Sequence, residues 1–201
     1  MERFFKLISY IFHPLFFPLA GTIVYYIISP KYHPPSMLQS VISAVVILTV
    51  LIPIIFFFLL KNIGWIKSIY LEDINERRVP LYIYIFLIFI VIKRVVPPVL
   101  SIELYYYFIG VLGALIACLL LVFFKIKASM HMMGIAALFF FVLGLSFHYE
   151  VNITFGLAVL MFLSGMIASA RLFLKAHTGI ELALGFLIGG LPQFITFSYW
   201  L

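Results

Sequence analysis

Seven long apolar stretches, separated by short segments with charges or prolines, dominate the pattern of hydrophobic and polar positions along the chain. About twenty apolar residues are enough to cross the hydrocarbon core of a bilayer as a helix. In lipid the backbone N–H and C=O groups must be paired, so we expect helices rather than strands. The pattern predicts an all-α, polytopic transmembrane bundle of about seven helices, at residues 8–29, 38–60, 81–97, 103–124, 132–148, 152–170 and 180–200.

The composition supports a protein whose solvent is mostly lipid. The chain has 201 residues, of which 66% are hydrophobic and only 10% are charged. A soluble domain does not carry so much apolar side chain. No linker or low-complexity stretch divides the chain, so we expect one integral membrane domain, 1–201. The expected location is a bacterial inner (cell) membrane. The first apolar stretch contains Pro14 and Pro18 and no Ala-x-Ala cleavage site, so we expect a retained, broken helix that satisfies His13 internally.

Most of the basic residues lie in connections that open on one face of the predicted bundle. The connections 61–80, 125–131 and 171–179 are separated by even numbers of crossings, so they can converge into one site. The net charge is +6, and the basic residues cluster at the ends of apolar segments instead of forming a run. Membrane lipids and an anionic substrate explain this pattern, and nucleic acid is not an expected partner. At the other face we expect the helix-end residues to be interfacial, namely Glu103, His148 and Glu150.

The connection 171–179 and the start of the next helix carry the sharpest chemical signal. Arg171, His177 and Glu181 stand close together in a very apolar chain. On a helix, His177 and Glu181 would share one face and could form a hydrogen bond. A histidine oriented by a carboxylate, beside cations such as Arg171 and Lys175, suits nucleophilic attack on an anionic centre such as phosphate.

Two other connections hold residues that could bind an anion. Ser129 and His131 stand at the start of a predicted helix, where backbone N–H groups, a hydroxyl and an imidazole can bind an anion and donate a proton to it. Ser129 could equally be only a helix cap, and His131 only an interfacial residue. Arg77 and Arg78 are adjacent at the membrane boundary, where paired guanidinium groups suit a phosphate. Alternatively, Arg77 and Arg78 could belong only to a solvated charged loop that binds no ligand.

Together the three segments resemble the signature motifs of the type 2 phosphatidic acid phosphatase (lipid phosphate phosphatase, vanadium haloperoxidase-like) superfamily. Their order is Arg-Arg-x-Pro, Ala-Ser-Met-His and Arg-x5-His-x3-Glu. The family pattern is Lys-x6-Arg-Pro, Pro-Ser-Gly-His and Ser-Arg-x5-His-x3-Asp. Arg171 and His177 are in register in the third motif, where Glu181 replaces the aspartate. In the second, Ala128 and Met130 replace proline and glycine, and a side chain at the glycine position narrows the approach of phosphate to the backbone.

The first motif departs furthest from the family pattern. Val79 separates Arg78 from the proline, and Leu71 stands where the family has lysine. Lys67 or Lys127 could supply the missing cation. We expect the first apolar stretch to be an additional helix that precedes the six helices of the family, which keeps the arginine connection on the face of the site.

The resemblance implies a metal-independent membrane hydrolase without a cofactor. His177 would attack phosphorus to form a phosphohistidine, Glu181 would orient it, and His131 would protonate the departing oxygen and then activate water. The phosphoryl oxygens would be bound by Arg171, Arg78, Arg77, Ser129 and Lys127. The substrate would be a lipid phosphate or diphosphate, such as phosphatidic acid, phosphatidylglycerol phosphate, undecaprenyl diphosphate or lipid A phosphate.

Two other functions fit the same residues. An intramembrane metalloenzyme could use His131, His177 and Glu181, since the last two also have helical metal-ligand spacing. A small transporter or a non-catalytic relative could bind a lipid phosphate without cleaving it.

The side of the membrane that holds the site is predicted differently by two arguments. The positive-inside tendency puts the charged connections in the cytoplasm, whereas the resemblance implies the outer side. We favour the outer side, because arginines retained for phosphate inflate the count of basic residues. An odd number of helices puts the two termini on opposite sides.

Overall fold

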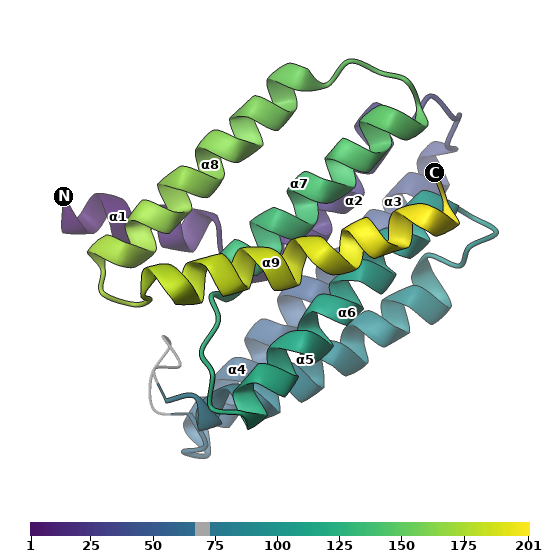
Figure 1. The fold of residues 1–201 in the computed structure, drawn as a ribbon. Coiled ribbons are helices and arrows are strands. Elements are labelled where there is room, and N and C mark those ends of the chain that lie inside the picture. Colours follow the sequence, from purple (N-terminus) through teal and green to yellow (C-terminus); the bar gives the residue numbers. More distant parts are fainter. Residues whose placement is uncertain (67–72) are drawn as a thin grey trace.

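The computed structural model describes residues 1–66 and 73–201, and in this part of the chain all regular structure is helical (Figure 1). The α-helices are α1 (Glu2–Ile11), α2 (Phe17–Ile28), α3 (Pro35–Val46), α4 (Ile52–Asn62), α5 (Arg78–Ile90), α6 (Ile102–Phe123), α7 (Met130–His148), α8 (Thr154–Phe173) and α9 (Gly179–Thr196). Short 3-10 turns lie at Pro14–Phe16, Asn75–Arg77 and Phe197–Tyr199, and π-helical segments at Ile47–Leu51 and Val91–Val95. The predicted all-α fold is confirmed.

In the described part of the chain these elements form seven rods that follow the predicted spans. α1 and α2 make one broken rod, a π-helical segment joins α3 to α4, and another extends α5. Among the described residues, six rods are long and apolar enough to cross a membrane. The remaining rod, α5 with its extension, carries Lys93 and Arg94 near its end. The chain is therefore a polytopic membrane protein, as its sequence predicts.

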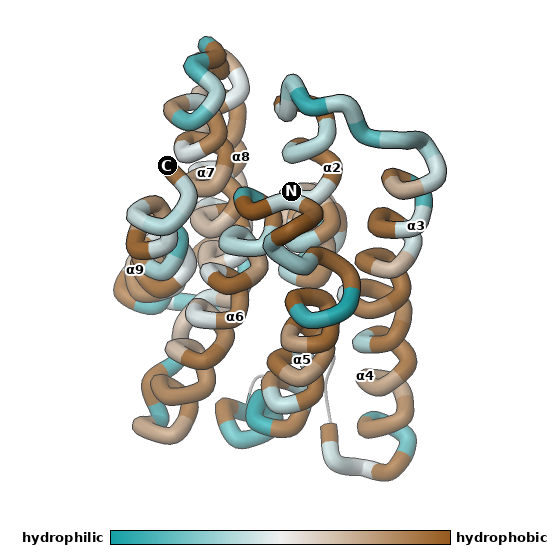
Figure 2. The backbone as a smooth tube through the Cα atoms, turned by 90° about the vertical axis from the view of Figure 1, so that its right-hand side faces the viewer, coloured by the Kyte–Doolittle hydropathy of each residue, from teal (hydrophilic) through white to brown (hydrophobic). Residues whose placement is uncertain are grey.

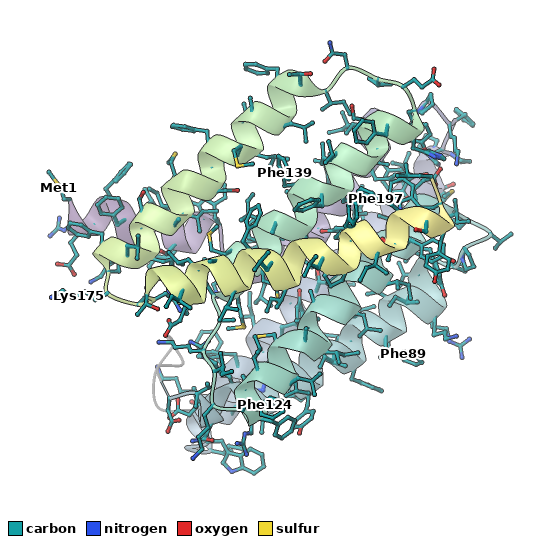
Figure 3. All side chains as sticks on the ribbon, viewed as in Figure 1. Met1, Phe89, Phe124, Phe139, Lys175 and Phe197 are labelled. Carbon is teal, nitrogen blue, oxygen red and sulfur yellow. The ribbon has the colours of Figure 1, made fainter. Side chains whose placement is uncertain are left out.

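Polar residues gather at the two ends of the rods, whereas apolar residues cover their sides (Figure 2). Apolar side chains such as Phe89 and Phe124 project outward from the bundle (Figure 3), and Phe124 is 74% exposed. This distribution is typical of a bundle whose sides face lipid.

α9 crosses α6 and α7 at close range and fixes the start of α7 (Figure 1). Gly185 and Gly189 lie about one helical turn apart and face the backbone of α7. A Cβ atom at Gly185 would lie 2.4 Å from the Ser129 carbonyl oxygen, and one at Gly189 would lie 2.1 Å from that of Met133. The two glycines therefore let the backbones of α7 and α9 touch, as small residues do between membrane helices.

Glu103 lies at a helix end, as expected, but it is buried there rather than exposed. Its side chain is fully buried in the first turn of α6, where it forms an ion pair with Lys31. The carboxylate accepts hydrogen bonds from Tyr149 Oη at 2.9 Å and Ser101 Oγ at 3.2 Å, and His148 Nε2 lies 3.2 Å away. The charge can be buried because these donors replace water around it. Glu103 thereby ties together the connections at the end of the bundle opposite the predicted site.

Candidate active site

The three connections that carry the predicted site residues meet at one end of the bundle. Arg77 Nη1 donates to the Ala128 carbonyl oxygen at 3.1 Å, which joins the first connection to the second. Lys127 Nζ donates to the Ala176 carbonyl oxygen at 3.0 Å, which joins the second to the third. The expected convergence is therefore confirmed. Lys67 lies outside the described residues.

A sharp reversal after α8 places His177. Lys175 adopts a φ of +52°, and the N–H of Ala176 donates at 3.0 Å to the carbonyl oxygen of Arg171. This is the hydrogen-bond pattern of a Schellman motif, which ends a helix and turns the chain back. The turn is seen where Figure 3 labels Lys175 between α8 and α9. His177 is thereby brought back beside the end of α8, which carries Arg171.

The predicted hydrogen bond between His177 and Glu181 is present, but its structural basis differs from the prediction. His177 precedes α9 rather than lying on it, and Thr178 is the N-cap. Thr178 and Glu181 form a capping box, in which the Glu181 carboxylate accepts the Thr178 N–H at 3.3 Å. The same oxygen, Oε2, lies 2.7 Å from His177 Nδ1. The cap therefore holds the carboxylate that orients the imidazole.

The surroundings of His177 keep its imidazole neutral and oriented. A carboxylate accepts hydrogen bonds, so Nδ1 carries the proton and Nε2 has the free lone pair. Burial, together with the charges of Arg171, Arg77 and Lys127, lowers the pKa of His177 to about 4, although the hydrogen bond to Glu181 opposes this shift. At neutral pH the ring is uncharged, which is the state that a nucleophilic histidine needs.

At the start of α7, Ser129 caps the helix, whereas His131 contacts the N-terminal segment of the chain. Ser129 is fully buried and caps α7, because its Oγ accepts the N–H of Met132 at 3.5 Å. Its own N–H donates to the carbonyl oxygen of Glu181 at 3.0 Å, which joins α7 to α9. His131, also buried, lies with Nε2 3.1 Å from the carbonyl oxygen of Ser9.

A single cavity of about 470 Å³ contains four of the predicted site residues, Arg77, His131, Arg171 and His177. From this polar end it extends between α4, α5, α6 and α7, where its walls include Phe57, Leu60, Ile83, Tyr84, Val111 and Ala137. Met130, which stands at the glycine position of the family pattern, is part of the wall. A mostly apolar cavity with a few converging polar groups is typical of a small-molecule binding site.

Arg78, Lys127, Ser129 and Glu181 are not among the residues that line this cavity. Arg78 lies instead over the ring of Phe123, with its Cζ atom 5.3 Å from the ring centroid. Successive side chains at the start of a helix point in different directions, so only one of two adjacent arginines can face the cavity. The structure gives that position to Arg77, which is 3% exposed, whereas the sequence could not choose between the two.

The sequence prediction missed the contribution of the N-terminal helix. Ser9 and His13 both line the cavity, and the His13 ring packs against that of His131 with 5.8 Å between centroids. His13 was expected only to be satisfied within a broken helix, and its Nδ1 does accept the N–H of Leu15 at 3.4 Å. The sequence feature that could have indicated this role is the pair Ser9 and His13, which stand four residues apart in an apolar segment. An ionisable residue in such a segment marks a functional site by default.

The metal-site alternative finds no geometric support. Within the described residues, no group of three or more His, Cys, Asp or Glu side chains converges as metal ligands require.

The chemistry of the cavity follows from its own groups. It combines a neutral imidazole oriented by a carboxylate, a second imidazole and two guanidinium groups at the polar end of an apolar chamber. Such groups can attack an anionic centre, protonate it and bind its charge. Comparisons of the chain with protein-family models, with curated proteins and with solved structures found no match.

Proposed function

We propose that this protein is a membrane phosphatase that hydrolyses a lipid phosphate or diphosphate through a phosphohistidine intermediate. One observation carries the proposal: a single cavity joins the His177 imidazole, His131 and two arginines at one end to an apolar arm between helices at the other. The motif resemblance to lipid phosphate phosphatases points to the same chemistry.

His177 is the nucleophile in this mechanism. Its Nε2 lone pair attacks phosphorus, a P–N bond forms, and the bond from phosphorus to the lipid oxygen breaks. Glu181 accepts the Nδ1–H and stabilises the positive charge that develops on the ring. Because burial and the neighbouring cations lower its pKa, no proton has to leave His177 before attack at neutral pH.

His131 moves the proton between the departing lipid and water. Neutral His131 first takes up a proton from water on its free ring nitrogen when the substrate binds, and passes it to the lipid oxygen as the P–O bond breaks. It then accepts a proton from the water that attacks the phosphohistidine. The second step releases inorganic phosphate, and His131 then gives its proton to solvent, which restores both neutral histidines. The placement of His131 on the wall of the same cavity as His177 supports this role.

Arg171 and Arg77 balance the charge of the phosphoryl group. Both are buried, at 6% and 3% exposure, and both line the cavity. Fixed cations in a site that excludes water stabilise a developing anion more strongly than the same charges do in water. Lys127 adds positive charge from just outside the cavity and contacts the Ala176 carbonyl oxygen.

The apolar arm of the cavity suits the hydrocarbon chain of the substrate. A headgroup at the helix ends and a chain between the helices match a lipid that enters from a bacterial cell membrane. We therefore place phosphatidic acid, phosphatidylglycerol phosphate, undecaprenyl diphosphate and lipid A phosphate ahead of soluble phosphate esters as substrates.

Phosphate release by purified protein in detergent micelles tests the proposal, with these four lipids as substrates. We expect release from at least one lipid, its persistence in EDTA, and its loss in His177→Ala. His33→Ala is the matched control, because His33 lies at the opposite end of the bundle, where it contacts Ser29 Oγ. Equal release by wild type and His177→Ala would overturn the proposal. Lipid binding without release would favour the non-catalytic alternative.

A further inference from the structure

The N-terminal helix α1 docks its last turn against two basic groups of the cavity, His131 and Arg171. The Ser9 carbonyl oxygen lies 3.1 Å from His131 Nε2, and Ser9 Oγ accepts a hydrogen bond from Arg171 Nη1 at 3.4 Å. Ser9 is 8% exposed, so water does not compete freely for these contacts. None of the three motif segments includes this residue.

The sequence explains why the Ser9 carbonyl is available. The last four carbonyl groups of a helix have no N–H partner further along the helix, and Ser9 lies in this last turn of α1. Pro14 and the extended backbone of His13 prevent the helix from continuing. The end of α1 therefore presents a carbonyl group, and the negative end of the helix dipole, to its neighbours.

We propose that α1 is a positioning element of the site, in which the Ser9 carbonyl fixes the tautomer of His131. A carbonyl oxygen only accepts hydrogen bonds, so Nε2 of His131 must carry a proton. The neutral ring then has its free lone pair on Nδ1. The partial negative charge at the end of α1 also stabilises the imidazolium that forms when Nδ1 takes a proton.

His177 and His131 are thus held by opposite ring nitrogens. Glu181 holds Nδ1 of His177 and frees Nε2 for attack, whereas Ser9 holds Nε2 of His131 and frees Nδ1 for proton transfer. The destination of that proton, the lipid oxygen or water, rests on the proposed phosphatase function. The tautomer itself does not.

The contact between α1 and α8 offers a way to disturb this arrangement without touching the cavity. Phe5 packs against Phe173 with 4.4 Å between ring centroids, whereas Phe4 on the same helix is 56% exposed. Phe5→Ala should loosen α1, and Phe4→Ala is its matched control. Ser9→Ala is a second control for the tautomer, because it removes the hydroxyl and keeps the carbonyl.

Nitrogen-15 NMR of the full-length protein in detergent micelles at pH 8 tests the tautomer directly, with the His131 signals assigned by their loss in His131→Asn. We expect a protonated Nε2 and a pyridine-type Nδ1 in wild type, Phe4→Ala and Ser9→Ala. Phe5→Ala should give a mixture of both tautomers. A protonated Nδ1 in wild type, or a Phe5→Ala spectrum identical to that of wild type, would overturn the proposal.

The activity of the same variants separates this proposal from the proposed function. We expect kcat of Phe5→Ala to fall by roughly 10²-fold, as a misplaced catalytic group does, with a smaller change in KM. Phe4→Ala should match wild type. Phosphatase activity together with the wrong tautomer would overturn only the role of α1, whereas the expected tautomer without phosphatase activity would overturn only the proposed function. Higher kcat in Phe5→Ala would show that α1 inhibits the site, which also contradicts the proposal.

Discussion

Replacing Gly189 by alanine should disturb the site from a distance, because this glycine sets the separation of α7 and α9. The added Cβ would lie 2.1 Å from the carbonyl oxygen of Met133 and 2.8 Å from its Cα atom. Both are backbone atoms of a helix, so no change of side-chain rotamer can relieve the contact. The helices must move apart by roughly 1 Å before the contact is tolerable.

The magnitude follows from two opposing terms. Overpacking of a close contact costs about 1–3 kcal/mol, whereas alanine is better than glycine inside a helix by about 0.5–1 kcal/mol. Because the contact is with backbone atoms, the cost lies in the upper part of its range, at about 2–3 kcal/mol, and we expect the free energy of unfolding of Gly189→Ala to fall by about 1–2.5 kcal/mol. The shift also stretches the bond from the Ser129 N–H to the Glu181 carbonyl oxygen, now 3.0 Å, and separates His131 from His177. A misplacement of about 1 Å lowers turnover by roughly 10²-fold.

Thermal unfolding in detergent micelles and lipid phosphate release measure the two effects. Gly165→Ala is the matched control, because a Cβ at that position of α8 meets nothing within 4 Å. We expect Gly165→Ala to unfold at the wild-type temperature or above it, with wild-type turnover. Wild-type stability and turnover in Gly189→Ala would refute the packing argument.

Three further predictions concern the site itself. If neutral His177 is the nucleophile, turnover should fall as the pH drops through about 4 instead of 6.5, and a fall near 6.5 would contradict the effect of burial. Glu181→Gln replaces the carboxylate, whose hydrogen bond raises this pKa, by a neutral amide that accepts more weakly. This variant should therefore move the fall in turnover to lower pH and reduce kcat by roughly 10²- to 10⁴-fold. Arg77→Gln should reduce kcat/KM by roughly 10²-fold, whereas Arg78→Gln should keep a kcat/KM near that of wild type. A large loss in Arg78→Gln with little change in Arg77→Gln would show that Arg78, and not Arg77, binds the phosphoryl group. Lys175→Gly should raise the free energy of unfolding by about 0.5–1 kcal/mol, because glycine adopts a φ of +52° without strain. Thermal unfolding measures this change. A lower free energy of unfolding would show that the lysine side chain stabilises the turn by its contacts.

Much of the fold was predictable because a membrane restricts what an apolar stretch can do. Length and hydropathy located seven spans, and the alternation of faces was enough to predict that the connections of Arg77, His131 and His177 would meet. The pairing of His177 with Glu181 was predictable from their spacing as well. Its basis in a helix cap was not, because spacing alone does not say where a helix begins.

The remaining features depend on contacts between segments that are far apart in the sequence. Periodicity shows which residues of one helix share a face, but it does not show which other helix that face meets. The docking of Ser9 on His131 requires α1 to bend away from α2 and pack against α8, and no local pattern encodes that partner. Glu103 could not be predicted as buried for the same reason, since its donors come from three other parts of the chain as well as its own helix cap.

A structure of the protein with bound orthovanadate, which mimics a phosphoryl group in transfer, tests the central claim most directly. The account predicts vanadium bonded to Nε2 of His177, with Arg171 and Arg77 donating to its oxygens and His131 Nδ1 within hydrogen-bond distance. Vanadate bound away from this cavity, or a His177 ring turned out of it toward lipid, would contradict the account.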